Sequence, residues 1–147
     1  MEKNLTEFLK EKYELPDVDI KTYSPLVLAY IGDGIYDLII RTIVVHQGNT
    51  QANKLHRRTS ELVKAATQAT MIDLLFEDMT TEEQDMFRRG RNAKSPTMAK
   101  NATMKDYRKA TGFEALMGYL YLKGDYERMT DLIKLGLARL EEQKGAK

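Results

Sequence analysis

The sequence predicts an all-α fold, and three observations lead to this expectation. Apolar residues recur at the three- and four-residue spacing of amphipathic helices along most of the chain. Helix start signals precede several of these stretches, among them Ser24-Pro25 and Thr80-Thr81-Glu-Glu. The alternation typical of β-strands is hard to find. Because 147 residues suit one hydrophobic core, we expect a single domain over residues 1–147.

Six helices are expected, and residues that start or stop helices bound each of them. Pro16 ends the first and Gly48 the second, while Thr50 and Thr80 are expected to cap the third and fourth. The small, basic, proline-containing segment 90–104 is expected to be a loop before the fifth helix. The expected ranges are residues 5–15, 25–47, 52–76 with room for one break, 81–90, 106–122 and 125–143.

Composition excludes several classes of site. The chain has no cysteine, which excludes disulfides, thiolate-bound zinc, iron–sulfur clusters and cysteine nucleophiles. The N-terminus lacks an apolar signal region, and no stretch approaches the ~18 apolar residues of a membrane span. We therefore expect a cytoplasmic protein without membrane contact. The near balance of 23 basic and 22 acidic residues, a net charge of +1, taken alone argues against a nucleic-acid partner.

Two acidic residues stand where apolar residues belong. Asp33 lies in the middle of the 25–47 stretch, which is apolar on nearly every side and is therefore expected to be buried. Glu114 lies in an equally apolar part of the 106–122 stretch. An unpaired buried carboxylate is costly, so each should meet a cation or several hydrogen-bond donors.

Glycines flank both acids, although a glycine inside a helix costs ~1 kcal/mol relative to alanine. Small residues let two helix backbones approach closely, so the two helices could cross at Gly32 and Gly34 on one side and Gly112 and Gly118 on the other. Asp33 and Glu114 would then hold one Mg²⁺, whose preferred ligands are oxygens. The alternative is that each acid pairs with a core arginine or caps a backbone turn.

The overall charge balance conceals a strongly basic segment. Residues 88–109 contain eight basic residues and one acidic residue, a local charge of +7. Basic side chains among small polar residues suit contacts with a sugar–phosphate backbone, and the scarcity of aromatic residues favours duplex over single-strand binding. A solvated loop without a partner is the alternative. The residues expected to bind RNA are Arg88, Arg89, Arg91, Asn92, Lys94 and Lys100.

Two motifs resemble those of the ribonuclease III family. The first is Leu28-Ala-Tyr-Ile-Gly-Asp-Gly-Ile-Tyr-Asp-Leu38, which is similar to the family signature. The second is Phe113-Glu-Ala-Leu-Met-Gly-Tyr-Leu-Tyr-Leu122, which is similar to the family's second acidic motif. The order and separation of the motifs also fit. The resemblance covers most of the chain and implies the helical endonuclease-domain fold of that family.

The resemblance implies roles for particular residues. Asp33 matches the catalytic aspartate and Glu114 the metal-binding glutamate, while Asp37 is given a structural role. Two further acids of the large family are replaced here by Ala29 and Thr111, which leaves the number of Mg²⁺ ions open. No appended double-stranded-RNA-binding domain is expected. The chain therefore resembles the short bacterial subfamily known as Mini-ribonuclease III.

The resemblance also implies an activity. It implies a homodimeric, Mg²⁺-dependent endoribonuclease that cleaves double-stranded RNA, leaves 5′-phosphate and 3′-hydroxyl ends, and matures the ends of 23S ribosomal RNA precursor. Whether a ribosomal protein presents the substrate is left open. The competing hypothesis is a catalytically degenerate member of the family that binds RNA or ribosomes without cutting. A third is a helical scaffold that binds another protein.

Overall fold

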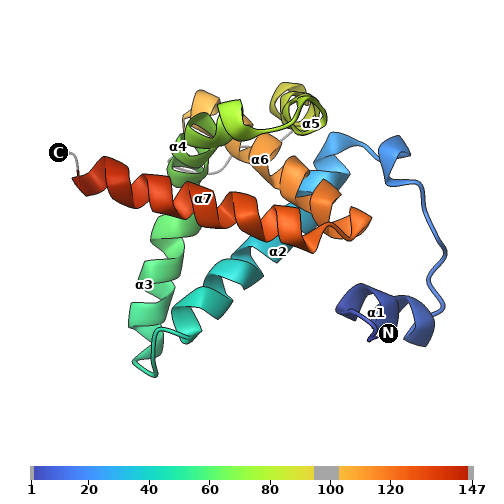
Figure 1. The fold of residues 1–147 in the computed structure, drawn as a ribbon, viewed down its shortest axis with the longest axis horizontal. Helices are drawn as coiled ribbons and strands as arrows, with labels where there is room; N and C mark the ends of the chain where they lie inside the picture. The colour runs from blue at the N-terminus through green and yellow to red at the C-terminus, as the bar shows by residue number, and fades with distance from the viewer. Residues whose placement is uncertain (1, 95–102, 146–147) are drawn as a thin grey trace.

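All regular structure in the described part of the chain is helical, which confirms the predicted fold class (Figure 1). The structure is a computed structural model and describes residues 2–94 and 103–145. The elements, in chain order, are α1 (Leu5–Lys12), η1 (Ile20–Thr22), α2 (Pro25–Val45), α3 (Ala52–Val63), α4 (Ala65–Leu75), η2 (Phe76–Asp78), α5 (Thr81–Asn92), α6 (Met104–Lys123) and α7 (Tyr126–Gly145).

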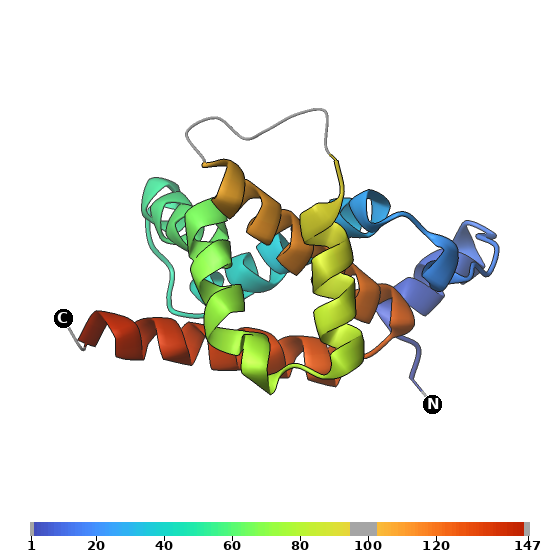
Figure 2. The same ribbon diagram turned by 90° about the horizontal axis from the view of Figure 1, so that it is seen from above.

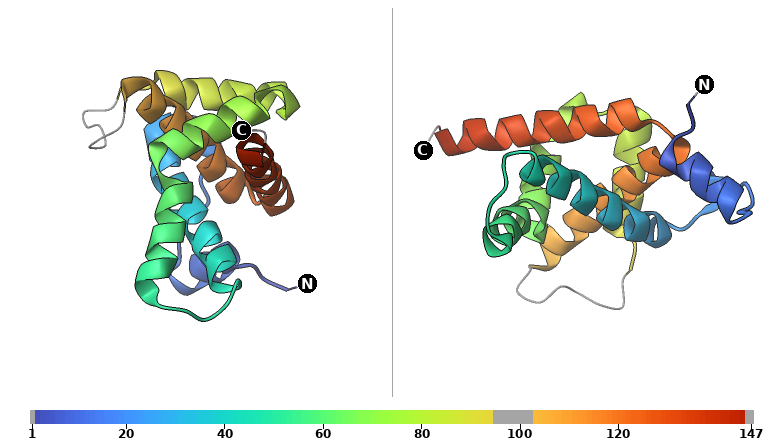
Figure 3. Two further views of the ribbon diagram at one scale, coloured as in Figure 1. Left: turned by 90° about the vertical axis from the view of Figure 1, so that its left-hand side faces the viewer. Right: turned by 90° about the horizontal axis from the view of Figure 1, so that it is seen from below.

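Helix α6 forms the centre of the fold. Every residue from Ala110 to Leu120 is buried except Glu114. Helices α4 and α5 flank α6 on either side (Figure 2), and α2 crosses it. Helix α7 packs across α4, while α1 stands at the edge of the molecule near the start of α7 (Figure 3), where the Thr6 and Tyr126 hydroxyls lie 3.3 Å apart. The central helix therefore presents Glu114 from inside the core.

Helices α2 and α6 approach so closely that only glycine fits at the crossing. A Cβ atom at Gly32 would lie 1.7 Å from the carbonyl oxygen of Glu114, and one at Gly118 would lie 1.9 Å from the carbonyl oxygen of Leu28. The expected crossing of the two helices is therefore present. The other two glycines act differently, since Gly112 faces Phe87 of α5 and a Cβ at Gly34 would meet nothing within 4 Å.

Most helix boundaries follow the expected signals. The Ser24 hydroxyl accepts a hydrogen bond from the Val27 amide at the start of α2, and Thr80 forms a capping box with Glu83 at the start of α5. The 52–76 stretch breaks once, at the extended residue Lys64. The expected Thr50 cap is wrong, because Gln51 occupies the N-cap of α3 and makes no side-chain capping bond.

Two further expectations need correction. Helix α1 ends at Lys12 rather than near Leu15, because the backbone turns away at Glu14, which has a φ of 52°. Helix α5 continues to Asn92, into the segment expected to be a loop.

Helix α2 is buried on one side only, contrary to the expectation that it is enclosed by core. The side that faces α6 is buried, whereas Tyr30 is 80% exposed and Leu38 is 53% exposed. The apolar character of the opposite face therefore has a cause other than packing within this chain. None of the helices in residues 2–94 and 103–145 combines the length and the apolar character needed to cross a bilayer.

Candidate active site

The structure brings the two predicted acids together at the crossing of α2 and α6. Asp33 follows Gly32, the residue of α2 that touches the backbone of Glu114, so the close approach also places the two carboxyl groups in hydrogen-bonding contact. Asp33 is exposed, which corrects the expectation of a buried aspartate, and Glu114 is half-buried. The pair thus has one member at the surface and one in the wall of the core.

The electrostatic state of the pair follows from burial and from the proximity of two like groups. Burial raises the pKa of Glu114 to about 8, and the hydrogen bond with Asp33 and the charge of Asp33 act in the same direction. A hydrogen bond from Gln68 opposes this rise. At neutral pH and without a cation, the pair therefore holds a proton on Glu114.

The pairing with a core arginine that was the alternative for these acids is not observed. Among residues 2–94 and 103–145, no lysine or arginine nitrogen lies within 4.0 Å of a carboxylate oxygen of Asp33 or Glu114. The nearby basic residues are engaged elsewhere: Lys109 bonds Asp73 at 2.7 Å, and Arg41 bonds Asp37 at 2.7 Å.

Gln68 of α4 is a third polar residue at this site, and the sequence interpretation missed it. Its Nε2 donates to the Val63 carbonyl at 2.8 Å and to Glu114 Oε2 at 3.4 Å. Only 1% of Gln68 is exposed, because it shares a helix face with the buried residues Met71 and Ile72. The available signal was a glutamine at a position whose helical spacing assigns it to the core.

A tyrosine closes the base of the site. Tyr36 of α2 is fully buried, and its hydroxyl donates to the Leu62 carbonyl at 2.8 Å. Its ring meets Phe113 of α6 edge-on, with centroids 5.1 Å apart. Burial and the nearby charge of Glu114 raise the pKa of Tyr36 far above its ordinary value. Tyr36 is therefore a neutral packing residue beneath the acids.

The residues present fit a hard divalent cation such as Mg²⁺. The available ligands are the two carboxyl groups, and oxygen is the ligand type that Mg²⁺ prefers. Within the described residues no cluster contains three acids or histidines. Thr111 adds no acid, and its hydroxyl donates to the Tyr107 carbonyl at 3.0 Å. Water or substrate phosphate oxygens would have to fill the remaining positions around the ion.

The residues expected to bind RNA lie where α5 ends, and they differ in their surroundings. Arg88, Arg89, Asn92 and Lys94 are exposed, and Arg88 also pairs with Asp85 at 3.3 Å. The guanidinium groups of Arg88 and Arg91 stack on the rings of Phe76 and Phe87, at 5.2 and 5.5 Å from the ring centroids. Lys100 falls outside the described residues.

Arg91 and Asn92 also line an open pocket of about 460 Å³ that continues onto the first turns of α6. Its lining contains four basic side chains and no acidic one, and we refer to it as the basic pocket. The lining residues are Arg91, Asn92, Met104, Lys105, Arg108 and Lys109.

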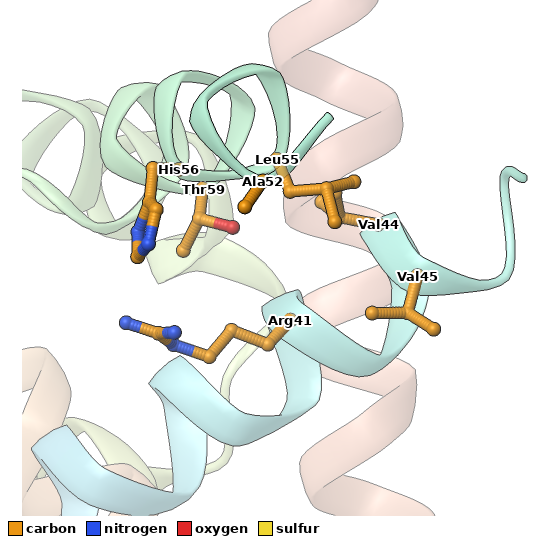
Figure 4. Close-up of a pocket in the computed structure, with 7 residues that line it drawn as sticks. All are labelled: Arg41, Val44, Val45, Ala52, Leu55, His56 and Thr59. Carbon is orange, nitrogen blue, oxygen red and sulfur yellow. The ribbon is translucent and has the colours of Figure 1, made fainter. Parts of the chain in front are cut away.

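A second pocket has a different character. It lies between the C-terminal half of α2 and α3 and is lined by Arg41, Val44, Val45, Ala52, Leu55, His56 and Thr59 (Figure 4). Most of this lining is hydrocarbon, and the one arginine already bonds Asp37. The pocket therefore does not suit a phosphate, and neither acid of the pair lines it.

Comparisons with known proteins identify relatives of this chain. A Mini-ribonuclease 3 from Thermoanaerobacter is 45% identical over 142 residues, covering 97% of this chain and 100% of the relative. One from Clostridium tetani is 46% identical over 130 residues, covering 88% and 86%. A crystal structure of a protein from Fusobacterium nucleatum is similar with a TM-score of 0.74 at 29% identity, covering 83% and 98%.

The ribonuclease III domain family matches residues 26–125, a range that includes both acidic motifs and the whole α2–α6 crossing. The match confirms the resemblance that the two motifs indicated. The chain belongs to the ribonuclease III family, whose members are endoribonucleases.

Proposed function

We propose that this protein cleaves double-stranded RNA by hydrolysis, with Asp33 and Glu114 holding Mg²⁺ at the α2–α6 crossing. One observation carries the proposal. Two carboxyl groups contact each other at a glycine-mediated helix crossing, and no described basic residue neutralises them. A fold gains no stability from such a pair, because two acids in contact repel each other once both are ionised. A divalent cation bound by both carboxyl groups would explain why they lie together.

The chemistry follows from the positions of the two acids. A bound Mg²⁺ would activate water and stabilise the negative charge that develops on a phosphate. Asp33 is exposed and can therefore face the scissile phosphate, while Glu114 is anchored in the core helix. Glu114 must lose its proton to serve as an anionic ligand. The rigid crossing fixes the spacing of the two groups in advance, so little reorganisation is needed.

The basic pocket supports the choice of a polyanionic substrate. Three of its four basic side chains, those of Lys105, Arg108 and Lys109, lie in the first two turns of α6, the helix that carries Glu114, and the fourth, that of Arg91, lies near the end of α5. Cations placed in this way bind phosphates without reading bases, which suits recognition of a duplex by shape. We assign Arg88, Arg89, Arg91, Asn92, Lys94 and Lys100 to the same RNA-binding surface.

The finer parts of the proposal concern assembly and substrate. We propose a cytoplasmic homodimer, for which the exposed apolar residues of α2 supply an interface. From the resemblance of the two acidic motifs we further propose the 23S ribosomal RNA precursor as the natural substrate, with a ribosomal protein as an accessory partner. Mapping cleavage ends on precursor RNA, with and without ribosomal proteins, tests both parts.

A cleavage assay tests the central claim. The wild-type protein should cut a long RNA duplex with Mg²⁺ and stop when a chelator is added. Asp33→Asn should reduce cutting below detection while leaving duplex binding and the oligomeric state unchanged, since only one side of the acid pair is lost. Asp37→Asn is the matched control, because Asp37 lies one turn away on the same helix but bonds Arg41. That variant should keep its activity.

The degenerate-family hypothesis predicts a different result. It requires duplex binding without turnover at any concentration of Mg²⁺ or Mn²⁺. We favour the enzyme, because the structure keeps both acids in contact at the crossing. Full cutting activity in Asp33→Asn would overturn the proposed role of the acid pair.

A further inference from the structure

Gln68 carries a buried oxygen that the two-acid site leaves unexplained. The side chain is 1% exposed, and its Oε1 is the buried side-chain oxygen without a hydrogen-bond partner in the described residues. Leaving a buried acceptor unpaired costs free energy, and folded proteins rarely do so. Its neighbours on the same helix face, Met71 and Ile72, are almost fully buried apolar residues. A methionine or leucine at position 68 would suit the core better, so stability does not explain the glutamine.

The surroundings fix which way the amide group faces. The Val63 carbonyl is only an acceptor, so the nitrogen must point toward it, at 2.8 Å. The second N–H of the same nitrogen is directed at Glu114 Oε2, at 3.4 Å. Turning the amide over would place its oxygen against the Val63 carbonyl. Oε1 therefore belongs to the same amide group as Nε2, the atom that contacts Glu114.

The chemistry of a hydrated cation matches this unpaired oxygen. Mg²⁺ keeps several of its water molecules when it binds to proteins, and those waters donate their hydrogens outward. These water molecules require hydrogen-bond acceptors, and an acceptor suits them best when it carries no hydrogen of its own. The two further acids of the family are absent here and cannot accept these hydrogen bonds. Ala29 has no polar side chain, and the Thr111 hydroxyl donates to the Tyr107 carbonyl.

We propose that Gln68 is a further residue of the cation site. Its Nε2 positions Glu114, and its Oε1 accepts a hydrogen bond from a water of the ion's hydration shell. The inference rests on the proposed function, since it requires a cation at Asp33 and Glu114. Residues that orient metal ligands typically change metal affinity by about 10- to 100-fold when they are replaced. Gln68 is a positioning residue in this scheme.

Direct titration of Mn²⁺ without RNA tests the proposal, with free Mn²⁺ followed by electron paramagnetic resonance. Gln68→Met removes both polar atoms at nearly constant volume and should weaken Mn²⁺ binding by about 10- to 100-fold. Gln84→Met is the matched control, because Gln84 Nε2 likewise donates to a backbone carbonyl, that of Phe76 at 2.8 Å. The control should bind Mn²⁺ as the wild type does. Thermal unfolding should show both variants folded.

A second variant keeps the test decisive if Gln68→Met does not fold. Gln68→Leu also lacks both polar atoms and should weaken Mn²⁺ binding by about 10- to 100-fold. If folded Gln68→Met binds Mn²⁺ as tightly as the wild type while Asp33→Asn no longer binds it, the inference about Gln68 is wrong and the proposed function stands. An equal loss in Gln84→Met would also overturn the inference. If the wild type binds no Mn²⁺, the proposed function falls as well.

Discussion

The protein contains two glutamates that are largely withdrawn from water, and their neighbours move their pKa values in opposite directions. Glu83 is 5% exposed, but two hydrogen bonds from Arg128, at 2.7 and 2.8 Å, hold its pKa below the ordinary value. Glu114 has an acid as its neighbour instead of an arginine, and its pKa rises. Only the second carboxyl is thus ready to exchange its proton for a metal cation at neutral pH.

This contrast gives a measurable prediction for the metal-free protein. Carbon-detected NMR of the carboxyl groups should show Glu114 titrating with a pKa of about 8. Asp33→Asn should lower that pKa without restoring the ordinary value, because the largest cause, burial, remains. Glu83 serves as the internal reference and should titrate below its ordinary 4.5 in both proteins. A Glu114 pKa near 4.5 in the wild type would contradict the described environment.

At the same scale, the sequence indicated the identity of the two acids but not their surroundings. Asp33 and Glu114 were identified by motif and by unusual placement in apolar stretches. Helical spacing could not show that Asp33 is exposed, because spacing alone does not tell which side of α2 is covered by other helices. Gln68 escaped notice because α4 is distant from both motifs in sequence, and only the fold brings it to Glu114.

Among the helices, the α2–α6 crossing is the element pair on which the site depends. Its separation is set by backbone contact, since a Cβ at Gly32 or Gly118 would fall within 2 Å of a carbonyl oxygen of the other helix. The spacing of Asp33 and Glu114 is fixed by the same contact. Sequence reasoning anticipated the crossing from the paired glycines, but it could not separate Gly32 and Gly118 from Gly34, where an added Cβ would meet no atom of the described residues within 4 Å.

Alanine substitutions separate these glycines. Gly32→Ala must push the helices apart, and overpacking of this kind typically costs about 1–3 kcal/mol or more. Gly34→Ala should instead leave the subunit fold intact or stabilise it by up to ~1 kcal/mol, because alanine is the better helix former. Urea unfolding at one protein concentration measures both. Equal stability of the two variants would show that the crossing is not limited by backbone contact.

The net charge of the whole molecule is near zero, but its acidic and basic residues have different roles. Acidic residues around α5 are bound to basic residues of α6 and α7: Asp78 to Arg139, Glu82 to Lys123 and Glu83 to Arg128. These pairs join helices within the fold. The basic pocket, by contrast, has no acid in its lining, and of its four bases Lys109 bonds an acid outside the lining, Asp73 of α4. The overall balance of 23 to 22 is therefore compatible with a strongly polarised RNA-binding surface.

The exposed face of α2 is a whole-molecule feature that packing within the described residues leaves unexplained. Its apolar residues Val27, Leu38 and Val45 are 49%, 53% and 57% exposed, and their spacing of 11 and 7 residues corresponds to nearly whole numbers of helical turns. They form one stripe, with Tyr30 beside it. Several exposed apolar residues in line on a core helix are typical of a protein interface. We assign it to the homodimer.

A charge placed in this stripe should separate the dimer. Leu38→Glu would bury an unpaired carboxylate in the interface, which is costly, so light scattering after gel filtration should find a monomer with unchanged helix content. Met104→Glu is the matched control, because Met104 is 51% exposed against 53% for Leu38 but lies on α6 beside the basic pocket. That variant should remain a dimer. A dimeric Leu38→Glu protein would place the interface elsewhere and leave the apolar face of α2 without a role in assembly.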